Sequence, residues 1–350
     1  MNPPNVPATI EELFDLEWMS AALGLRFPGI EVTDIAIGPE ISRLSTNARF
    51  TIQCAGGLPE GLSPNLCAKG YFTEQGRRVA FLGESEALFY KEVADSTGVR
   101  TLRCVYADVH PKSHHGVIIT EDAVAAGATF LDALTEPSVD RTAASLEELA
   151  KLHATTRDAP RLADAAWLNW RLPTYTQFRG LADIQANYDG PVGAGVPEKV
   201  KDAQRLVDAL DVLSERGDPA TGHWSVLHGD AHCGNLFVDA DGRPGLVDWQ
   251  VVQRGPWYID IAYHIGSSLD SSSRGQNERD LLAHYLDHLR SNGAEAPEWD
   301  QAWSEYRQGL AYGLFMWAVT LLVDPEITTT LVERMSVAVA ELDTFGALGV

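Results

Sequence analysis

The sequence predicts an α+β protein with two parts, a small antiparallel β-sheet followed by a larger and mostly helical region. Short apolar stretches separated by glycine and proline crowd the first third of the chain, which is typical of strands joined by turns. From residue 124 onward, apolar residues recur instead at intervals of three and four, the spacing of amphipathic helices. A chain of 350 residues has room for two such parts, and we expect them to cover residues 1–122 and 123–350.

The N-terminal part is predicted to open with a helix and to continue with strands. Thr9 and Glu12 form a capping box, so a short amphipathic helix should begin there and end near Gly24. Strands are expected next, each bounded by turn residues, at residues 32–37, 48–54, 66–72, 79–82 and 116–119.

The helical part is predicted from its caps and its spacing. Ser145 and Glu148 form a second capping box, and Leu146, Leu149 and His153 then share one face of a helix. We interpret His153 as a hydrogen-bonded core residue, because a histidine on an apolar helix face is rarely a ligand. Further helices are expected at residues 198–216, 278–290 and 299–323.

The most informative stretch lies between residues 226 and 260. A short strand leads into a polar loop that holds Asp230 and Asn235, and a hairpin then carries the chain back to Asp248. We therefore expect these three side chains to converge. Mg²⁺ takes oxygen ligands and usually one or two carboxylates plus substrate phosphates, which suits Asn235 and Asp248. Asp230 would then take the proton of an acceptor hydroxyl as a phosphoryl group is transferred.

Other interpretations of this stretch and of the remaining histidines are available. The same residues fit a polar loop and a hairpin whose acids are simply solvated. His228 and His232 lie four apart and would suit Zn²⁺ on a helix, although Gly229 and Gly234 favour a loop. A cluster near residue 112 could bind a metal or form a solvated loop; it contains His110, His114 and His115.

Lys69 is the second anchor of a candidate site. It is one of only six lysines, and it lies inside a predicted strand, where a charge is costly unless it is paired. A helix expected over residues 81–90 offers Glu84 and Glu86 as partners. The alternative is an edge-strand lysine whose ammonium group reaches water.

The loop and hairpin motifs resemble those of the aminoglycoside phosphotransferase and choline kinase superfamily, whose members share a protein-kinase-like fold and phosphorylate small molecules. The resemblance covers about residues 35–270 and implies that Asp230 is the catalytic base, that Asn235 and Asp248 bind Mg²⁺, and that Asp260 braces the loop. The superfamily pattern of HGDxxxxN, a D-W pair and GPxxxD is matched at His228, Gly229, Asp230, Asn235, Asp248, Trp249, Gly255, Pro256 and Asp260.

The resemblance also implies a two-lobed arrangement with ATP between the lobes. Lys69 and Glu86 would position the phosphates, and the spacing of Glu86 from Phe89 and Tyr90 is similar to that of the ecdysteroid-kinase-like branch. The adenine would be bound by a hinge formed by Thr120, Glu121 and Asp122. Secondary-structure propensity alone would assign these three residues to the end of a strand.

The sequence departs from the superfamily pattern at two places. The segment expected over the phosphates, residues 38–49, holds only Gly38. Gln250 follows the D-W pair where many relatives have glutamate. No GxxxxGK[ST] or GxGxxG motif occurs, which excludes two other common nucleotide sites.

The amino-acid composition limits the classes of molecule that the protein is expected to bind. With 27 basic and 49 acidic residues the net charge is −22, which argues against nucleic acid and is compatible with either a cationic substrate or simple solubility. Four cysteines without C-x-x-C spacing fit reduced thiols in a cytoplasmic protein. The first residues do not resemble a secretory signal, and the most apolar run is roughly half as long as a membrane span requires, so we expect no membrane association.

The predicted function is ATP- and Mg²⁺-dependent transfer of a phosphoryl group to the hydroxyl of a small molecule. Two classes of acceptor fit the sequence. One is a hydroxylated lipid-like or steroid-like metabolite, and the other is an aminoglycoside or other polycation. A non-catalytic nucleotide-binding protein of the same fold is the other alternative, and loss of Asp230, Asn235 or Asp248 would mark it. Aromatic residues of the helical part are expected to pack in its core or to line an acceptor pocket, namely Trp167, Trp170, Tyr175, Tyr188, Trp257, Trp303, Tyr312 and Trp317.

Overall fold

The computed structural model describes residues 4–321 and 323–350, and the chain divides into two compact units. The first, called the N-unit here, runs to Thr129 and includes Asp239–Gly242 and Val247–Val251. The second, the C-unit, contains Phe130–Val238, Arg243–Leu246 and Val252–Val350. The roles predicted for residues 1–122 and 123–350 stay predictions.

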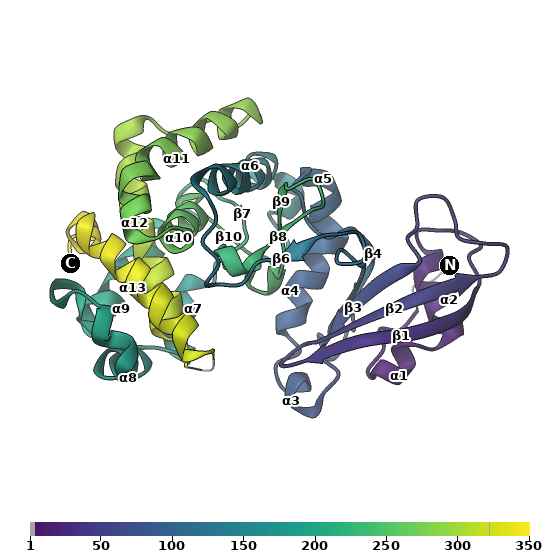
Figure 1. Ribbon diagram of the computed structural model, residues 1–350. Helices are drawn as coiled ribbons and strands as arrows, with labels where there is room; N and C mark the ends of the chain where they lie inside the picture. Colours follow the sequence, from purple (N-terminus) through teal and green to yellow (C-terminus); the bar gives the residue numbers. More distant parts are fainter. Residues whose placement is uncertain (1–3, 322) are drawn as a thin grey trace. The chain divides into compact units, whose positions relative to one another are not determined.

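The N-unit is built on a five-stranded antiparallel sheet with the order β1-β2-β3-β5-β4 (Figure 1). Its core lies between one face of this sheet and two short N-terminal helices, α1 and α2. The strands are β1 (Val32–Ser42), β2 (Thr46–Cys54), β3 (Asn65–Gly70), β4 (Cys104–Val109) and β5 (Gly116–Glu121). The helices are α1 (Ile10–Leu13), α2 (Leu16–Gly24), α3 (Glu74–Arg77), α4 (Leu82–Phe89), η1 (Tyr90–Ala94) and α5 (Asp95–Thr97), with η6 (Trp249–Val251) from the hairpin.

Two local predictions for the N-unit need correction. The strand expected at residues 79–82 is wrong, because the backbone N–H groups there bond to carbonyls three residues earlier and form turns that lead into α4. Residues 38–49 form a β-hairpin and not a long loop, since β1 extends to Ser42 and pairs with Thr46 at the start of β2; their place over the phosphates stays a prediction. The capping box at Thr9 is confirmed, because its side chain accepts the N–H of Glu12.

The C-unit is mostly helical, and its centre is α10 (Tyr258–Ser268), whose residues are all buried. This helix packs against α6, α11, α12 and α13 (Figure 1). The other helices are α6 (Val139–Thr156), α7 (Leu172–Phe178), α8 (Leu181–Asp189), α9 (Ala203–Arg216), α11 (Ser271–Ser291), α12 (Trp299–Ala318), α13 (Pro325–Glu341) and α14 (Thr344–Leu348), with short 3₁₀ turns η2 (Pro160–Leu162), η3 (Pro191–Gly195), η4 (Glu198–Val200) and η5 (Cys233–Asn235).

Two small sheets carry the loop motifs. In the C-unit, β7 (Ser225–Leu227) pairs with β10 (Gln253–Gly255), and β8 (Leu236–Val238) pairs with β9 (Pro244–Leu246). The short strand β6 (Thr129–Phe130) lies where the chain passes between units. The predicted α+β class, with an antiparallel N-terminal sheet and a larger helical region, is confirmed.

Four helices in the C-unit have other bounds than predicted. The helix expected at residues 198–216 is α9, which begins at Ala203 after a 3₁₀ turn, and the helix expected at residues 278–290 is α11, which is longer and spans Ser271–Ser291. The cap of α6 is Ser138, not Ser145, because Ser138 accepts the N–H of Arg141, whereas Ser145 lies inside the helix and bonds to the Thr142 carbonyl. The helix expected over residues 299–323 ends at Ala318, with residue 322 outside the described part of the chain. Among the described residues, no helix is both long and apolar enough to cross a membrane.

Candidate active site

Lys69, Glu86 and Asp248 come together in the N-unit. The Lys69 Nζ lies 2.7 Å from Glu86 Oε2 and donates to Asp248 Oδ1 at 2.9 Å. Side chains of a strand alternate between faces, so Ala68 enters the core while Lys69 points to the opposite face, toward α4 and Glu86. The other predicted partner, Glu84, pairs instead with His114.

The two carboxylates keep Lys69 charged. Burial would by itself lower the pKa of Lys69, but the nearby Asp248 and Glu86 carboxylates raise this pKa well above its ordinary value. A permanent positive charge held in place by two acids can bind phosphate oxygens without any proton transfer.

Asp248 occupies a strained backbone position that its neighbour stabilises. Its φ of 65° lies in the left-handed region, which costs a residue other than glycine about 1–3 kcal/mol. The next residue, Trp249, is fully buried and stacks on Phe89 at a ring-centroid distance of 3.7 Å. Its indole Nε1 also donates to Thr101 Oγ1 at 2.9 Å. Trp249 is thus fixed in the core, whereas the neighbouring Asp248 projects a carboxylate whose side chain is 41% exposed.

The predicted hinge residues lie at the end of β5, with their side chains engaged inside the N-unit. Glu121 pairs with Arg103 at 3.0 Å. Asp122 accepts from Arg49 Nε at 2.6 Å and from the N–H groups of Val124 and Ala125, which fixes the turn that follows the strand. Thr120 is buried in the sheet and pairs with Cys67 and Cys104. The main-chain N–H groups of Glu121 and Asp122 also donate within the N-unit, to the carbonyls of Arg103 and Asn65. Adenine contacts of this segment stay a prediction.

In the C-unit, Asp230 is held by hydrogen bonds to both of its carboxylate oxygens. Tyr263 donates its hydroxyl to Asp230 Oδ1 at 3.0 Å. Asn235 donates its side-chain amide to Asp230 Oδ2 at 3.2 Å and to the Asp230 carbonyl at 2.8 Å. Burial, and next the Asp230 charge, raise the pKa of the Tyr263 hydroxyl well above its ordinary value, so that it stays a donor at neutral pH. The amide NH₂ of Asn235 is committed in this way, and Oδ1 is its remaining ligand atom.

Asp260 fixes the loop backbone, as predicted. Its fully buried carboxylate accepts the N–H groups of His228 at 2.7 Å and Gly229 at 2.8 Å, and His153 Nε2 lies 3.2 Å away. His153 Nδ1 contacts the hydroxyl of Tyr285 at 2.9 Å, which confirms that His153 is a hydrogen-bonded core residue. Burial would raise the pKa of Asp260, but these hydrogen bonds and the nearby histidines lower it overall, so the carboxylate stays ionised.

His264 holds the other side of the loop. Its Nδ1 lies 2.7 Å from the carbonyl of Ala231, and its Nε2 lies 2.6 Å from the hydroxyl of Ser145. A carbonyl only accepts, so the Nδ1–H donates to Ala231, and a neutral ring then accepts from Ser145 at Nε2. Burial lowers the pKa of His264 to about 4, so the ring is neutral in the folded protein.

We expect His264 to make the protein less stable in mild acid. Its pKa is about 4 when folded and about 6.5 when unfolded, so between these values the unfolded chain binds more protons. Stability should fall by about 3 kcal/mol as the pH drops from 6.5 to 4. Urea unfolding at four pH values should show a shallower slope for His264→Gln than for wild type. Equal slopes for His264→Gln and the wild type would contradict the prediction.

The zinc alternative for the loop does not fit its geometry. His228 Nδ1 accepts the N–H of Asp230, and His232 Nδ1 accepts the N–H of Gly234. When Nδ1 accepts, the proton of a neutral ring is on Nε2, so neither nitrogen offers a free lone pair to Zn²⁺. The cluster near residue 112 is also a structural loop, in which His110 accepts from Ser113 and His115 accepts from Tyr71.

Several residues around the loop carry no sequence motif. Tyr263 and His264 lie on the apolar helix α10, and Tyr285 lies on the buried face of α11, where their sequence positions resemble ordinary core positions. The only hint for Tyr263 is that it follows Asp260 by one helical turn. Tyr312 and Trp317, two of the aromatic residues expected either in the core or in an acceptor pocket, lie beside the catalytic loop. Tyr312 donates to the Gly229 carbonyl at 2.6 Å, and Trp317 packs edge-on against His232.

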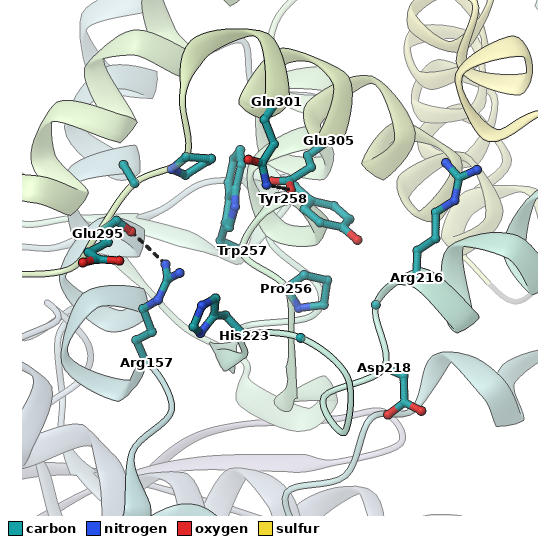
Figure 2. Close-up of a pocket in the computed structure, with 14 residues that line it drawn as sticks. Arg157, Arg216, Asp218, His223, Pro256, Trp257, Tyr258, Glu295, Gln301 and Glu305 are labelled. Atoms are coloured by element: carbon teal, nitrogen blue, oxygen red, sulfur yellow. Dashed lines mark hydrogen bonds between the residues drawn. The ribbon is translucent and has the colours of Figure 1, made fainter.

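A separate pocket of about 410 Å³ opens in the C-unit (Figure 2). Figure 2 shows Arg157 donating to the main-chain carbonyl of Glu295, and Trp257 and Tyr258 also line the pocket. None of the predicted catalytic, metal-binding or nucleotide-binding residues lines this pocket. We assign it no part in the chemistry.

Comparison with solved structures gives several similar chains, each of low sequence identity. The choline kinase LicA from Streptococcus pneumoniae is 12% identical, with 93% of this chain and 98% of that chain covered and a TM-score of 0.48. A macrolide 2'-phosphotransferase type I is 17% identical, with coverage of 98% and 99% and a TM-score of 0.46. The GDP complex of an aminoglycoside 2'-phosphotransferase-IIIa is 12% identical, with coverage of 93% and 99% and a TM-score of 0.49. Among curated proteins none matches.

Comparison with family models gives a match to the phosphotransferase enzyme family, over residues 106–315. The match covers more than half of the 350-residue chain and includes the loop, the hairpin and the bracing Asp260. It confirms the phosphotransferase family expected from the motifs. The chain therefore belongs to the phosphotransferase enzyme family and is a phosphotransferase that acts on hydroxyl groups.

Proposed function

We propose that the protein transfers the γ-phosphate of ATP to the hydroxyl of a small molecule with a largely apolar body, and that it requires Mg²⁺. The observation that carries this proposal is the Lys69 ammonium held between Glu86 and Asp248, at 2.7 and 2.9 Å. A buried lysine paired with a helix glutamate is the arrangement that kinases use to bind nucleotide phosphates.

The available side-chain atoms fit Mg²⁺. Asn235 has committed its amide nitrogen to Asp230 and offers an oxygen, and Asp248 offers a carboxylate that is 41% exposed. Oxygen donors of this kind, with only one carboxylate, suit an ion that keeps several waters and phosphate oxygens. When bound, Mg²⁺ would neutralise charge on the phosphates. We assign Asn235 and Asp248 as its ligands.

Asp230 is the proposed base. It would accept the proton of the acceptor hydroxyl as the acceptor oxygen bonds to the γ-phosphorus and the bond to the bridging oxygen breaks, releasing ADP. Tyr263 and Asn235 each occupy one of its oxygens, which fixes the direction in which the carboxylate points. Lys69 would hold the nucleotide phosphates by its charge.

Exposed apolar side chains support an apolar acceptor. Near the catalytic loop, Trp317 of α12 packs on His232, and just beyond the end of this helix Leu321 and Val323 are exposed. Two side chains bond to main-chain carbonyls at this end of α12. Asn187 of α8 donates to the Ala318 carbonyl, and Arg179, which precedes α8, donates to the Val319 carbonyl. On that neighbouring segment Leu181 is exposed and Phe178 is 83% exposed. Contiguous exposed apolar patches mark binding surfaces more often than singly exposed apolar side chains do. We call Phe178, Leu181, Leu321 and Val323 the apolar rim.

An aminoglycoside or other polycation is the second candidate acceptor. The net charge of −22 favours it, because an acidic surface attracts cations. A general surface charge does not place carboxylates around a ligand, whereas the apolar rim is a local feature of the C-unit. We therefore rank the polycation second.

An acceptor screen tests the proposal. Purified protein with ATP and Mg²⁺ should release ADP faster when hydroxylated apolar compounds such as sterols or macrolides are added, and aminoglycosides should give little or no stimulation. Phe178→Asp should raise the KM for the active acceptor by roughly tenfold, as expected for a lost apolar contact of about 1–3 kcal/mol. An exposed leucine of the N-unit provides the control, Leu58→Asp, which should behave as wild type. Stimulation by aminoglycosides alone would overturn the acceptor class, and no stimulation by any hydroxyl compound would overturn the function.

A further inference from the structure

We propose that Glu147, His284 and His288 form a binding site for Zn²⁺ or a similar late first-row divalent ion, distinct from the Mg²⁺ ligands assigned above. Glu147 lies on α6, and both histidines lie on α11, which packs against α6. The histidines are four residues apart, so they project from the same face of α11, and their ring centroids are 4.4 Å apart. Two imidazoles and a carboxylate are a common ligand set for zinc.

The distances within this trio suit one ion. Glu147 Oε1 lies 3.1 Å from His284 Nε2 and 3.7 Å from His288 Nε2. Bonds of about 2.0–2.2 Å at tetrahedral angles place ligand atoms roughly 3.3–3.6 Å apart, so the two distances bracket the required spacing. The three ligand atoms also lie within 4.8 Å of one another. Small side-chain rotations are then enough to complete three bonds to a single ion.

The surroundings of the trio leave room for a water molecule as fourth ligand. The three side chains are between 33% and 37% exposed, so they are accessible from solvent yet anchored on two packed helices. Among the described residues, no other trio of histidine, cysteine, aspartate or glutamate side chains converges in this way. Hydrogen bonds from both rings to the same Glu147 oxygen are the alternative arrangement, and the metal titration below distinguishes it from a bound ion.

The ligand types select the ion. Imidazole nitrogen favours zinc, nickel, copper and cobalt, whereas Mg²⁺ requires oxygen ligands and gives up its water reluctantly. The Mg²⁺ used for phosphoryl transfer would therefore not compete for this site.

A bound ion would join the two helices that support the brace of the catalytic loop. His153 on α6 and Tyr285 on α11 contact each other at 2.9 Å, and His153 in turn contacts Asp260. Tyr285 follows the ligand His284 directly in the chain. Because an ion that binds only the folded state stabilises it, Zn²⁺ should raise the melting temperature.

Metal titration of the purified, chelator-treated protein tests this site. Zn²⁺ should bind with a stoichiometry of one by calorimetry and raise the melting temperature, Co²⁺ should give the visible absorption of a four-coordinate ion, and Mg²⁺ should do neither. Loss of one ligand in Glu147→Gln, His284→Gln or His288→Gln should weaken Zn²⁺ binding by roughly 100-fold.

The control variant His223→Gln alters an exposed histidine elsewhere on the C-unit and should bind Zn²⁺ as wild type does. Circular dichroism of each variant without metal separates loss of a ligand from loss of the fold, and at least two of the three ligand variants are expected to fold because their side chains lie at the surface. Wild-type Zn²⁺ affinity in the folded ligand variants, or no Zn²⁺ binding by the wild type, would overturn the proposal.

Discussion

Replacing Asp230 by asparagine is expected to lower the turnover of acceptor phosphorylation by roughly 10²–10⁴-fold, the usual contribution of a general base. Asparagine has the shape of aspartate but cannot take the proton of the acceptor hydroxyl. The loop should keep its conformation, because Asn235 also donates to the carbonyl of residue 230 and Asp260 holds the N–H groups of His228 and Gly229. Nucleotide affinity and melting temperature should therefore stay close to those of wild type.

The measurement is kcat with the acceptor identified in the screen, beside the dissociation constant of the nucleotide. Asp211→Asn makes the same chemical change at an exposed position of α9 and serves as the control. If Asp230→Asn keeps most of its turnover, Asp230 is not the base. If it loses both turnover and nucleotide binding, its effect is structural.

Replacing Lys69 by methionine is expected to be the most destabilising of the substitutions considered, and to remove most nucleotide binding. Methionine keeps the length of the side chain but leaves Glu86 buried without its positive partner, which costs about 3–5 kcal/mol of unfolding free energy. Asp248 is partly exposed and can be solvated instead, so the loss should come mainly from Glu86.

A double variant separates charge from packing. Lys69→Met together with Glu86→Gln removes both charges of the pair, and it should recover most of the stability lost in Lys69→Met without recovering nucleotide affinity. Urea unfolding and nucleotide titration of the two single variants and the double variant measure both effects. Additive losses of stability would show that the two side chains do not depend on each other, contrary to the 2.7 Å ion pair.

The local elements around the site could be predicted from sequence because their signals are local. The strand that ends before His228 and the hairpin that leads to Asp248 are bounded by turn residues, and the ladder of β8 and β9 begins directly after Asn235 and ends two residues before Asp248. Lys69 could be singled out because a charge within an apolar strand needs a partner. These inferences need only the alternation of apolar and polar residues in strands, the residues typical of turns, and the free-energy cost of burying a charge.

Other features depend on tertiary partners that no local pattern reveals. Tyr263, His264 and Tyr285 look like core residues in sequence. Tyr263 and His264 gain polar partners where α10 packs against the catalytic loop and α6, and Tyr285 gains one where α11 packs against α6. Ser145 had the pattern of a helix cap, but α6 begins earlier and uses this hydroxyl to bond to His264. Residues 79–82 have the apolar character of a strand, yet their backbone makes only short-range hydrogen bonds.

The most direct test of the central claim is the chemical identity of the product. Wild-type protein is incubated with ATP, Mg²⁺ and the acceptor that stimulates ADP release, and the reaction is followed by ³¹P NMR. We expect the γ-phosphate to appear as a phosphomonoester on a hydroxyl oxygen of the acceptor, in amounts equal to the ADP formed. Formation of inorganic phosphate alone, of a phosphorus–nitrogen bond, or of an adenylylated acceptor would contradict it.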